Sequence, residues 1–458
     1  MSDRQEYASI SVDEGRLDAM LQAEQSHWYA GHQECRRLHD RAKKTQLHGT
    51  PTYRVNHFPS AVPIFITEAN GARLTDVDGH SYADFSLSGS AALFGHRHPK
   101  AVAAMREQLD RALMSDWPTE DHVQVTELMQ QKFGLPIWQF SLSAADANRF
   151  ALRFARIATG RQKILVFNNT YHGSLDETHA VLDGGQVVAP DGVSRNGFDV
   201  SSTTVVAEFN DIEATERLLR SREVAAVIVE PAITTRRSIV MPSPDFHRRL
   251  REITRATNTL LIVDETQTIV AGPGGFTQEF GLEPDILTMG KWAAGGLPIG
   301  MYGMTDAVAQ AVAGYDGRVM GSTLAGGALS THVMKTALSE IITEDSYALM
   351  TSAASRYADG VQAVISRLDL PWHVARLGAR VAFWFDPAPP ASGTISVSDA
   401  QAEARAKVHE AFWFFLANRG VLMSGWDCTS LFCPLLEEAD VTAHLTLVEQ
   451  AIEAVVAQ

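Results

Sequence analysis

The chain has 458 residues, of which 45% are hydrophobic and 20% are charged, and its formal net charge is −15. This composition is that of a globular protein with room for more than one domain, and the negative charge argues against a nucleic acid or an anionic membrane as the partner. Cys35, Cys428 and Cys433 lack metal-site spacing, so no metal is expected. No apolar run approaches the roughly 18 residues of a membrane span and no signal peptide is visible, so we expect a soluble cytoplasmic enzyme.

The first part of the chain combines a helix with short strands. Apolar residues spaced among polar ones predict a helix over 13–45, whose basic end we interpret as a solvated terminus. The pairs Asn70-Gly71 and Asp78-Gly79 then punctuate alternating segments and predict two hairpins.

From about residue 100, short apolar runs alternate with amphipathic helices. The runs "KILVFN", "VAAVIVEP" and "TLLIVDE" are typical of buried strands, and the segments 211–222 and 243–258 are typical of helices. This alternation predicts an α/β fold in which a mostly parallel sheet has helices on both faces.

After about residue 332, long helices surround one further strand, "RVAFWFDP". We therefore expect a second, smaller α+β domain, with a loop over 386–399. The predicted domains are 1–85 (an N-terminal helix and small β segment packing with the C-terminal domain), 86–331 (large) and 332–458 (small).

Lys291 is the single cation in the run "DILTMGKWAAGGLPIG". Asp264 closes the strand "LLIVD" 27 residues earlier, and ligands of such sheets sit at the carboxyl ends of the strands. A structural salt bridge would explain this pair. A site in which the lysine attacks a carbonyl while the carboxylate holds a protonated ring nitrogen would explain it as well, and pyridoxal 5′-phosphate (PLP) requires that arrangement.

Two further segments have the character of a PLP site. Ser143, Ala144 and Ala145 lead directly into an amphipathic helix, whose free N–H groups favour a phosphate, although ordinary helix capping gives the same pattern. Tyr171 and His172 follow a strand, where they could stack on a ring or simply pack.

Taken together, these segments resemble the fold-type I, class III PLP-dependent aminotransferases, in the branch of glutamate-1-semialdehyde aminomutase and the β-amino-acid aminotransferases. The resemblance covers roughly 45–455 and includes "LTDVDGHSYADF", "FGHRHP", "ALRFARIATGRQKI", "TYHG", "VIVEP", "LLIVDET", "LEPDILTMGK" and "GGLPIG". It implies the PLP-dependent transferase fold type I, with a large domain built on a seven-stranded-type sheet and a smaller α+β domain.

The resemblance implies roles for five residues that surround the cofactor ring. Lys291 is the Schiff-base lysine, and its apolar setting keeps the amine available. Asp264 pairs with the pyridine nitrogen, Tyr171 and His172 lie over the ring, and Glu230 occupies the family's acidic position near the cofactor.

The resemblance also assigns Gln267 to a position beside the cofactor's oxygen, and Thr323 to a threonine that reaches the phosphate of the neighbouring subunit. It therefore implies a homodimer with sites at the interface. The phosphate loop departs from the family's Ser-Gly-Thr-Glu-Ala-Asn, because Ala144 and Ala145 stand in it. Alanine keeps the backbone N–H but removes the threonine hydroxyl.

Substrate residues follow less directly. Arg54 lines up with a carboxylate-binding arginine of β-amino-acid members, Arg380 is a second candidate, and Trp426 replaces a C-terminal arginine. Trp426 with Phe58, Trp384 and Trp28 would make an aromatic pocket if they face it, although each could equally belong to the core.

These residues predict an aminotransferase that moves an amino group from an apolar or aromatic donor, with at most one carboxylate, to an oxo acid such as 2-oxoglutarate or pyruvate. The alternative is a PLP-dependent aminomutase or racemase of the glutamate-1-semialdehyde aminomutase type, although the pocket departures argue against the semialdehyde reaction itself. A non-catalytic binding protein with the same fold is a third possibility, and retention of Lys291 and Asp264 argues against it.

Overall fold

The computed structural model describes residues 10–52, 58–112, 117–190, 197–234, 239–315, 321–386 and 399–456. These residues form two compact units. The central unit comprises the described part of Pro99–Tyr347, and the terminal unit comprises the described parts of Met1–His98, Ala348–Ala388 and Ile395–Gln458.

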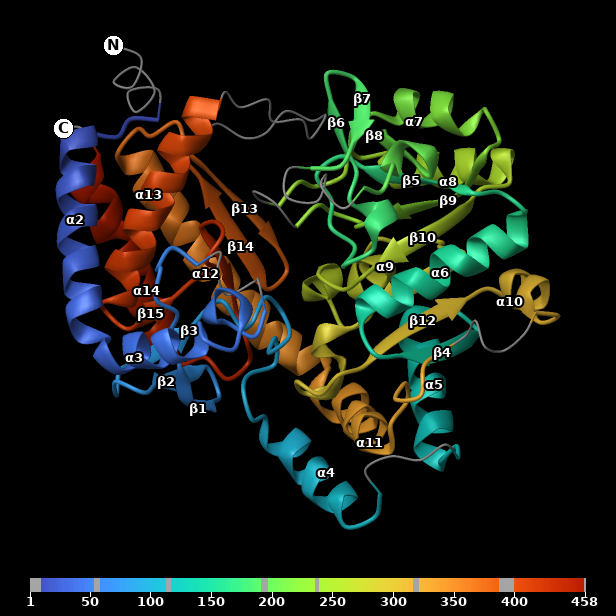
Figure 1. The fold of residues 1–458 in the computed structure, drawn as a ribbon, viewed down its shortest axis with the longest axis horizontal. Helices are drawn as coiled ribbons and strands as arrows, with labels where there is room; N and C mark the ends of the chain where they lie inside the picture. The colour runs from blue at the N-terminus through green and yellow to red at the C-terminus, as the bar shows by residue number, and fades with distance from the viewer. Residues whose placement is uncertain are drawn as a thin grey trace. The chain divides into compact units, whose positions relative to one another are not determined.

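The central unit is built on a seven-stranded sheet (Figure 1). Strand β12 runs antiparallel to β4 and β11, and the remaining neighbouring pairs are parallel, which confirms the predicted mostly parallel sheet. In spatial order the strands are β4 (Ile137–Ser141), β12 (Gly300–Met304), β11 (Ile286–Met289), β10 (Leu260–Asp264), β9 (Val224–Val229), β5 (Lys163–Phe167) and β8 (Thr204–Ala207).

Alternating side chains along the strands enter two separate cores. In β5, Ile164 and Val166 pack on the face covered by helix α6 (Ala144–Thr159), whereas Leu165 and Phe167 pack on the face covered by α7 (Ile212–Leu219) and α8 (Phe246–Thr257). A strand presents successive side chains to opposite faces, so an uninterrupted apolar run is what a sheet buried on both faces requires.

The central unit has further helices and one small hairpin. The helices are α4 (Pro99–Leu109), α5 (Glu120–Phe133), α9 (Gly275–Glu279), α10 (Asp306–Val312) and α11 (Ala328–Thr336), and the hairpin strands are β6 (Val181–Asp183) and β7 (Gln186–Val188).

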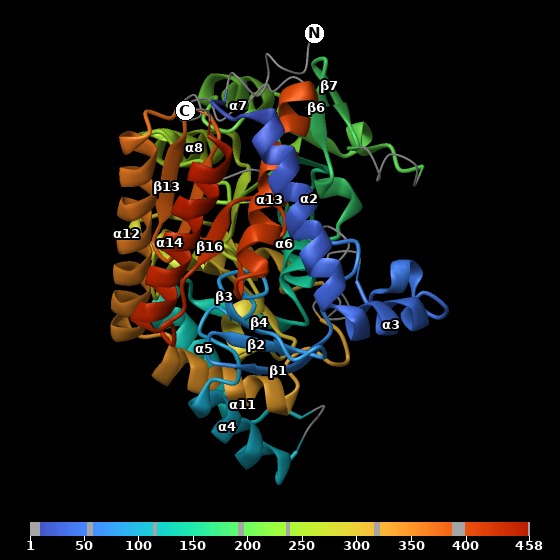
Figure 2. The same cartoon turned by 90° about the vertical axis from the view of Figure 1, so that its left-hand side faces the viewer.

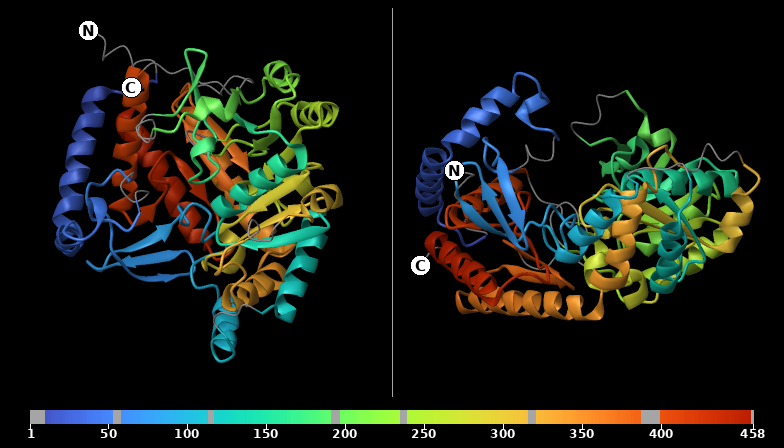
Figure 3. Two further views of the ribbon diagram at one scale, coloured as in Figure 1. Left: turned by 45° about the vertical axis from the view of Figure 1, so that its right-hand side comes forward. Right: turned by 90° about the horizontal axis from the view of Figure 1, so that it is seen from below.

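The terminal unit has two small sheets beside a group of helices (Figure 2). In it, α2 packs against α13 and α14, so that the first and last of the described helices lie side by side (Figure 3). The helices are α2 (Glu14–Gly31), α3 (Gln33–Ala42), α12 (Glu344–Arg367, whose first residues belong to the central unit), α13 (Asp399–Ala417) and α14 (Glu438–Val455). The sheets are β1 (Ile66–Asn70), β2 (Arg73–Asp76), β3 (Ser81–Asp84) with β15 (Val421–Leu422), and β13 (His373–Leu377), β14 (Arg380–Trp384) with β16 (Thr429–Leu431).

The structure corrects two predictions in this unit, and the first is that four strands, β13 to β16, follow residue 332 in the described part of the chain where one was expected. The single helix expected over 13–45 is two helices, because His32 leaves the helical conformation (φ −110°, ψ 56°) between α2 and α3. Both predicted hairpins are present, at Asn70-Gly71 and Asp78-Gly79. Most of the predicted loop 386–399 lies outside the described residues. Among the described helices, none has the length and apolar character needed to cross a membrane.

Candidate active site

The candidate site lies at the carboxyl edge of the central sheet. Asp264 is the last residue of β10, Glu230 directly follows β9, and Lys291 comes two residues after the end of β11. These three strands are adjacent and parallel, so their carboxyl ends meet at one edge, which is where ligands bind in open α/β sheets.

Asp264 is a buried carboxylate with three donors. It is 3% exposed; Oδ2 accepts from Asn148 Nδ2 at 2.8 Å and is 3.0 Å from His172 Nδ1, and Oδ1 accepts from the Thr266 N–H at 3.1 Å. Burial works to raise the pKa of Asp264, but the hydrogen bonds from His172, Thr266 and Asn148 outweigh it, and the pKa lies below its usual value. The residue therefore stays ionised, as a partner of a protonated ring nitrogen must.

Asn148 connects the elements around this carboxylate. Its amide also donates to the His172 carbonyl oxygen at 2.9 Å, and its side-chain oxygen accepts from the Thr288 hydroxyl on β11. No role was predicted for Asn148 from the sequence, although this residue stands at the asparagine that ends the family's Ser-Gly-Thr-Glu-Ala-Asn loop; the structure places it on the buried face of α6. It fixes α6, the loop after β5 and the ends of β10 and β11 relative to Asp264.

The turn before α6 is packed against the backbone that leads to Lys291. Ser143 caps the helix, since its Oγ accepts from the Asp146 N–H at 3.2 Å. A Cβ at Gly290 would lie 2.6 Å from the Ala144 nitrogen, and a Cβ at Gly173 would lie 2.6 Å from the Ala145 Cβ. Only glycine permits these approaches, which bring the first N–H groups of the helix, the natural place for a phosphate, next to Lys291.

Lys291 itself has an unusual backbone. Its φ of 56° lies in the left-handed region, which side chains other than glycine, asparagine and aspartate rarely adopt, and it begins a short 3-10 helix, Lys291–Ala294. Such strained residues cluster at functional sites, where the surrounding structure holds them in place.

Glu230 holds the loop that carries Tyr171. Glu230 is 2% exposed; its Oε1 accepts from the Tyr171 N–H at 3.2 Å and its Oε2 accepts from the Thr234 hydroxyl at 2.9 Å. The Tyr171 ring is 44% exposed and remains available for a ligand. Gln267 is half-buried just beyond Asp264, and Thr323 is exposed in a turn before α11.

The central unit therefore brings together Lys291, Asp264, Ser143, Ala144, Ala145, Tyr171, His172 and Glu230. Within the part of the chain that the structure describes, His172 Nε2 is buried without a hydrogen-bond partner. A ringed, phosphorylated cofactor fits this set, because the anionic carboxylate, the amine and the helix N-terminus lie at one sheet edge.

The predicted substrate residues belong to the terminal unit. Arg380 is 5% exposed at the start of β14, Trp426 is 52% exposed, and Arg54 lies outside the described residues. Their roles stay predictions. Trp28 is not part of the predicted aromatic pocket, because it is fully buried in the core and its Nε1 donates to Ser60 Oγ at 2.9 Å.

Comparisons with known proteins agree with this geometry. A family model described as Aminotransferase class-III matches residues 55–435. A glutamate-1-semialdehyde 2,1-aminomutase of Chloroflexus aggregans is 33% identical over 399 residues, which are 85% of this chain and 90% of that protein. The crystal structure of a glutamate-1-semialdehyde aminomutase from Pseudomonas aeruginosa PAO1 has a TM-score of 0.92 and 36% identity, covering 97% of this chain and 99% of that one. A lysine-to-alanine variant of a P. aeruginosa PAO1 aminomutase has been solved in complex with PMP.

A β-phenylalanine aminotransferase from Variovorax paradoxus shares the fold alone, at 22% identity and a TM-score of 0.83 over 95% of this chain and 97% of that one.

These comparisons correct the predicted reaction. Transfer from an apolar or aromatic donor to an oxo acid is wrong, because relatives at 31% to 36% identity over most of the chain are aminomutases. The prediction relied on aromatic residues, of which Trp28 belongs to the core. It also gave weight to Ala144 and Ala145, although alanine leaves the backbone N–H groups of the turn intact.

Membership follows from the match over most of the chain, from the buried Asp264 and from the lysine after β11: this chain belongs to the class III aminotransferases, PLP-dependent enzymes of fold type I, in the branch of glutamate-1-semialdehyde aminomutase.

Proposed function

We propose that the chain is a PLP-dependent aminomutase of the glutamate-1-semialdehyde type, which moves an amino group between carbons 2 and 1 of one small substrate. The observation that carries this proposal is the similarity to aminomutases over 97% of the chain. The alternative of a racemase on the same site is kept as an outcome of the test.

The bound cofactor supplies the electron sink that makes a proton on the substrate carbon removable. Lys291 Nζ would hold the cofactor and, once released, would move a proton between the cofactor and the substrate carbon, at one and then at the other of the two neighbouring carbons. Because both carbons belong to one molecule, a single lysine at a fixed place serves both transfers, and no oxo acid is needed.

Asp264 keeps the proton on the ring nitrogen, and this is the role for which its lowered pKa suits it. His172 and Asn148 orient the carboxylate, each through a hydrogen bond to Oδ2. Ser143, Ala144 and Ala145 bind the phosphate at the start of α6, Tyr171 lies over the ring, and Gln267 lies beside the cofactor's oxygen.

We further propose a cytoplasmic homodimer in which Thr323 reaches the phosphate of the neighbouring subunit. The exposure of Thr323 in its turn supports this role, because an exposed hydroxyl is open to a second chain. Arg54, Arg380 and Trp426 are the proposed contacts to the substrate.

The test is to incubate the PLP-loaded protein with glutamate-1-semialdehyde and no oxo acid. Exchange of the amino group and the aldehyde oxygen converts this substrate to 5-amino-4-oxopentanoate, which we expect to form with one product per substrate consumed. Lys291→Ala is the matched inactive control. Conversion that needs an added oxo acid, or loss of chirality without isomerisation, would contradict the proposal and indicate a transaminase or a racemase.

A further inference from the structure

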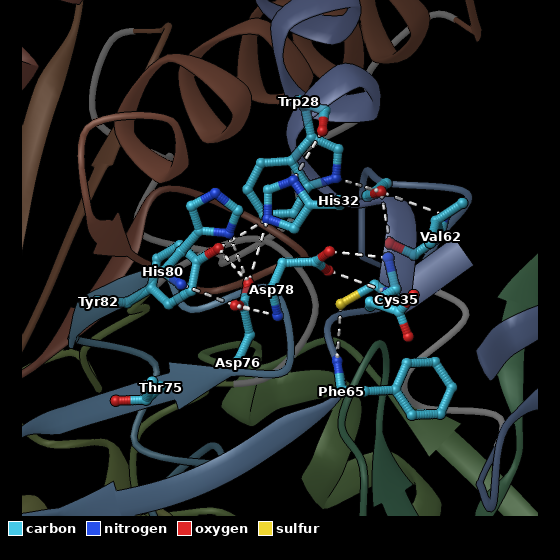
Figure 4. A network of polar contacts seen from close by, with 12 residues as sticks. Trp28, His32, Cys35, Val62, Phe65, Thr75, Asp76, Asp78, His80 and Tyr82 are labelled. Carbon is cyan, nitrogen blue, oxygen red and sulfur yellow. Dashed lines mark hydrogen bonds and ion pairs between the residues drawn. The ribbon is translucent and has the colours of Figure 1, made fainter. Parts of the chain in front are cut away.

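A second cluster of polar side chains lies in the terminal unit, where α2 and α3 meet the β2–β3 hairpin (Figure 4). His32 joins the two helices, Asp76 ends β2, and His80 precedes β3. One ligand atom from each of these residues lies within 4.8 Å of the other two. The proposed reaction uses none of them, and the sequence showed no metal-site spacing because the cluster joins residues 32, 76 and 80.

The spacing of the three atoms suits one small ion. Asp76 Oδ2 lies 3.3 Å from His32 Nε2 and 3.1 Å from His80 Nδ1. Ligands bound at about 2.0–2.2 Å to a tetrahedral ion are roughly 3.4 Å from one another. These two pairs therefore stand close to the edge length of such a site, and the two histidine nitrogens lie within 4.8 Å of each other.

The hydrogen bonds behind these atoms hold them in a ligating form. His32 Nδ1 is 2.7 Å from the Trp28 carbonyl oxygen, which can only accept, so Nδ1 carries a hydrogen and Nε2 is the ring nitrogen that can bind an ion. Asp76 Oδ1 accepts from the N–H groups of Asp78 at 3.0 Å and His80 at 2.9 Å, which leaves Oδ2 facing the cluster. Metal-binding histidines are oriented in this way by a backbone carbonyl.

The Tyr82 hydroxyl adds a further contact to the cluster. The Tyr82 hydroxyl donates to Asp76 Oδ2 at 2.8 Å, and its oxygen lies 2.7 Å from His32 Nε2. With the hydrogen of His32 on Nδ1, the Nε2 lone pair faces the tyrosine oxygen in a region where His32, Asp76 and Tyr82 are all buried. A cation between them removes that repulsion.

A neighbouring set, Cys35 with Asp76 and Asp78, fits less well. Asp78 already uses its two oxygens to accept the N–H groups of Glu34 and Cys35 at the start of α3, at 2.7 and 2.9 Å. Cys35 Sγ accepts the Phe65 N–H at 3.4 Å. These groups serve the helix terminus, so the ligands are the two imidazoles and Asp76.

We propose that His32, Asp76 and His80 bind one divalent transition-metal ion of the Zn²⁺ class, which ties α2 and α3 to the β2–β3 hairpin. Two imidazole nitrogens and one carboxylate favour Zn²⁺, Co²⁺ or Ni²⁺ over Ca²⁺ and Mg²⁺, which prefer oxygen. The His80 side chain is 41% exposed, so the ion enters from solvent and a water completes its coordination.

The experiment titrates untagged, PLP-loaded, chelator-treated protein with Zn²⁺ by calorimetry, and compares His80→Ala with His27→Ala. His80→Ala removes a ligand whose partial exposure makes the loss tolerable for folding. His27 is an exposed histidine on α2 and serves as the matched control. We expect one Zn²⁺ per chain in the wild type and in His27→Ala, with a raised melting temperature, and at least tenfold weaker binding in His80→Ala.

Absence of stoichiometric Zn²⁺ uptake by the wild type would overturn the proposal, and so would equal uptake by His80→Ala. Co²⁺ gives a second reading, because a low-coordinate N/O site produces visible absorption that should appear in the wild type and be lost in His80→Ala. The outcome is independent of the proposed aminomutase reaction, since no residue of the cluster belongs to that site.

Discussion

Each unit contains a buried aspartate beside a histidine, and the two surroundings differ. Asp264 in the central unit receives side-chain hydrogen bonds from buried Asn148 and His172. Asp76 in the terminal unit faces His32 and His80, of which His80 is exposed in part, and it accepts a hydrogen bond from the Tyr82 hydroxyl. The first carboxylate is held by a closed framework at a sheet edge, whereas the second lies in a network with an open side. The closed network holds the Asp264 carboxylate ionised and in one orientation, whereas the open side of the Asp76 network gives an ion access.

Removing the amine beside this framework should have the largest effect. Lys291→Ala should lower turnover by at least about 1000-fold, because both cofactor attachment and proton transfer are lost. The fold should persist, since alanine keeps the Cβ of lysine at the positive φ of residue 291, so the backbone strain is unchanged, and the sheet is untouched. Turnover assays with circular dichroism of the same sample check this; turnover near that of the wild type would rule out the assigned role.

Substitution of each aspartate by asparagine tests the difference between the two sites directly. Asp264→Asn should lower kcat by at least about 100-fold at saturating PLP, because a neutral amide cannot hold the proton on the ring nitrogen. Asp76→Asn should lower the melting temperature while kcat per folded molecule changes by less than about twofold. Steady-state kinetics and thermal unfolding of both variants test the contrast, and similar kcat losses in the two would contradict it.

Removal of a hydrogen bond to Asp264 that leaves its carboxylate in place should have an intermediate effect. Asn148→Ala deletes a hydrogen bond to a charged group, worth about 1.5–3 kcal/mol, and should weaken PLP binding by roughly 10- to 100-fold. Arg149→Ala on the exposed side of the same helix, which removes the ion pair with Asp146, is the control and should leave PLP affinity unchanged. Absorbance titration of apoprotein with PLP measures both. An Asn148→Ala affinity equal to that of Arg149→Ala would show that the bond to Asp264 is immaterial.

A histidine that lacks an acidic partner gives the smallest expected effect. His444 is fully buried between Tyr357 and Phe85, and burial lowers its pKa to about 3. When the pH is lowered from 7 to 5, the unfolded chain takes up a proton at this residue and the folded chain does not. The free energy of unfolding therefore decreases by about 2 kcal/mol over this range.

His444→Gln tests this prediction, because glutamine can keep a hydrogen bond to Ser430 and does not titrate. Urea unfolding at the two pH values should show a decline in the variant that is smaller by about that amount. Equal declines in the two proteins would mean that His444 takes up its proton in the folded state as well.

Strands β5, β9 and β10 of the central sheet could be predicted because each is a continuous apolar run, and the strand ends and helix starts then point to Asp264 and Ser143. Asn148 could not, because its role depends on Thr288 and Asp264, which are 140 and 116 residues away. Trp28 contributed to the wrong substrate prediction, because the sequence does not distinguish an aromatic residue in a core from one that lines a pocket. The break at His32 also went unseen, because its partners are in the β2–β3 hairpin.

Because segments near the two ends of the chain pair with each other, the terminal unit can fold completely only late in synthesis. The Asp13 N–H donates to the Val455 carbonyl oxygen at 2.8 Å, and β15 pairs with β3. The first hundred residues therefore leave the ribosome long before their partners exist, while the contiguous central unit can close in between. During that interval the apolar faces of the early helices and hairpins are exposed to solvent. Chaperone binding to the first hundred residues should therefore last until α14 has been synthesised.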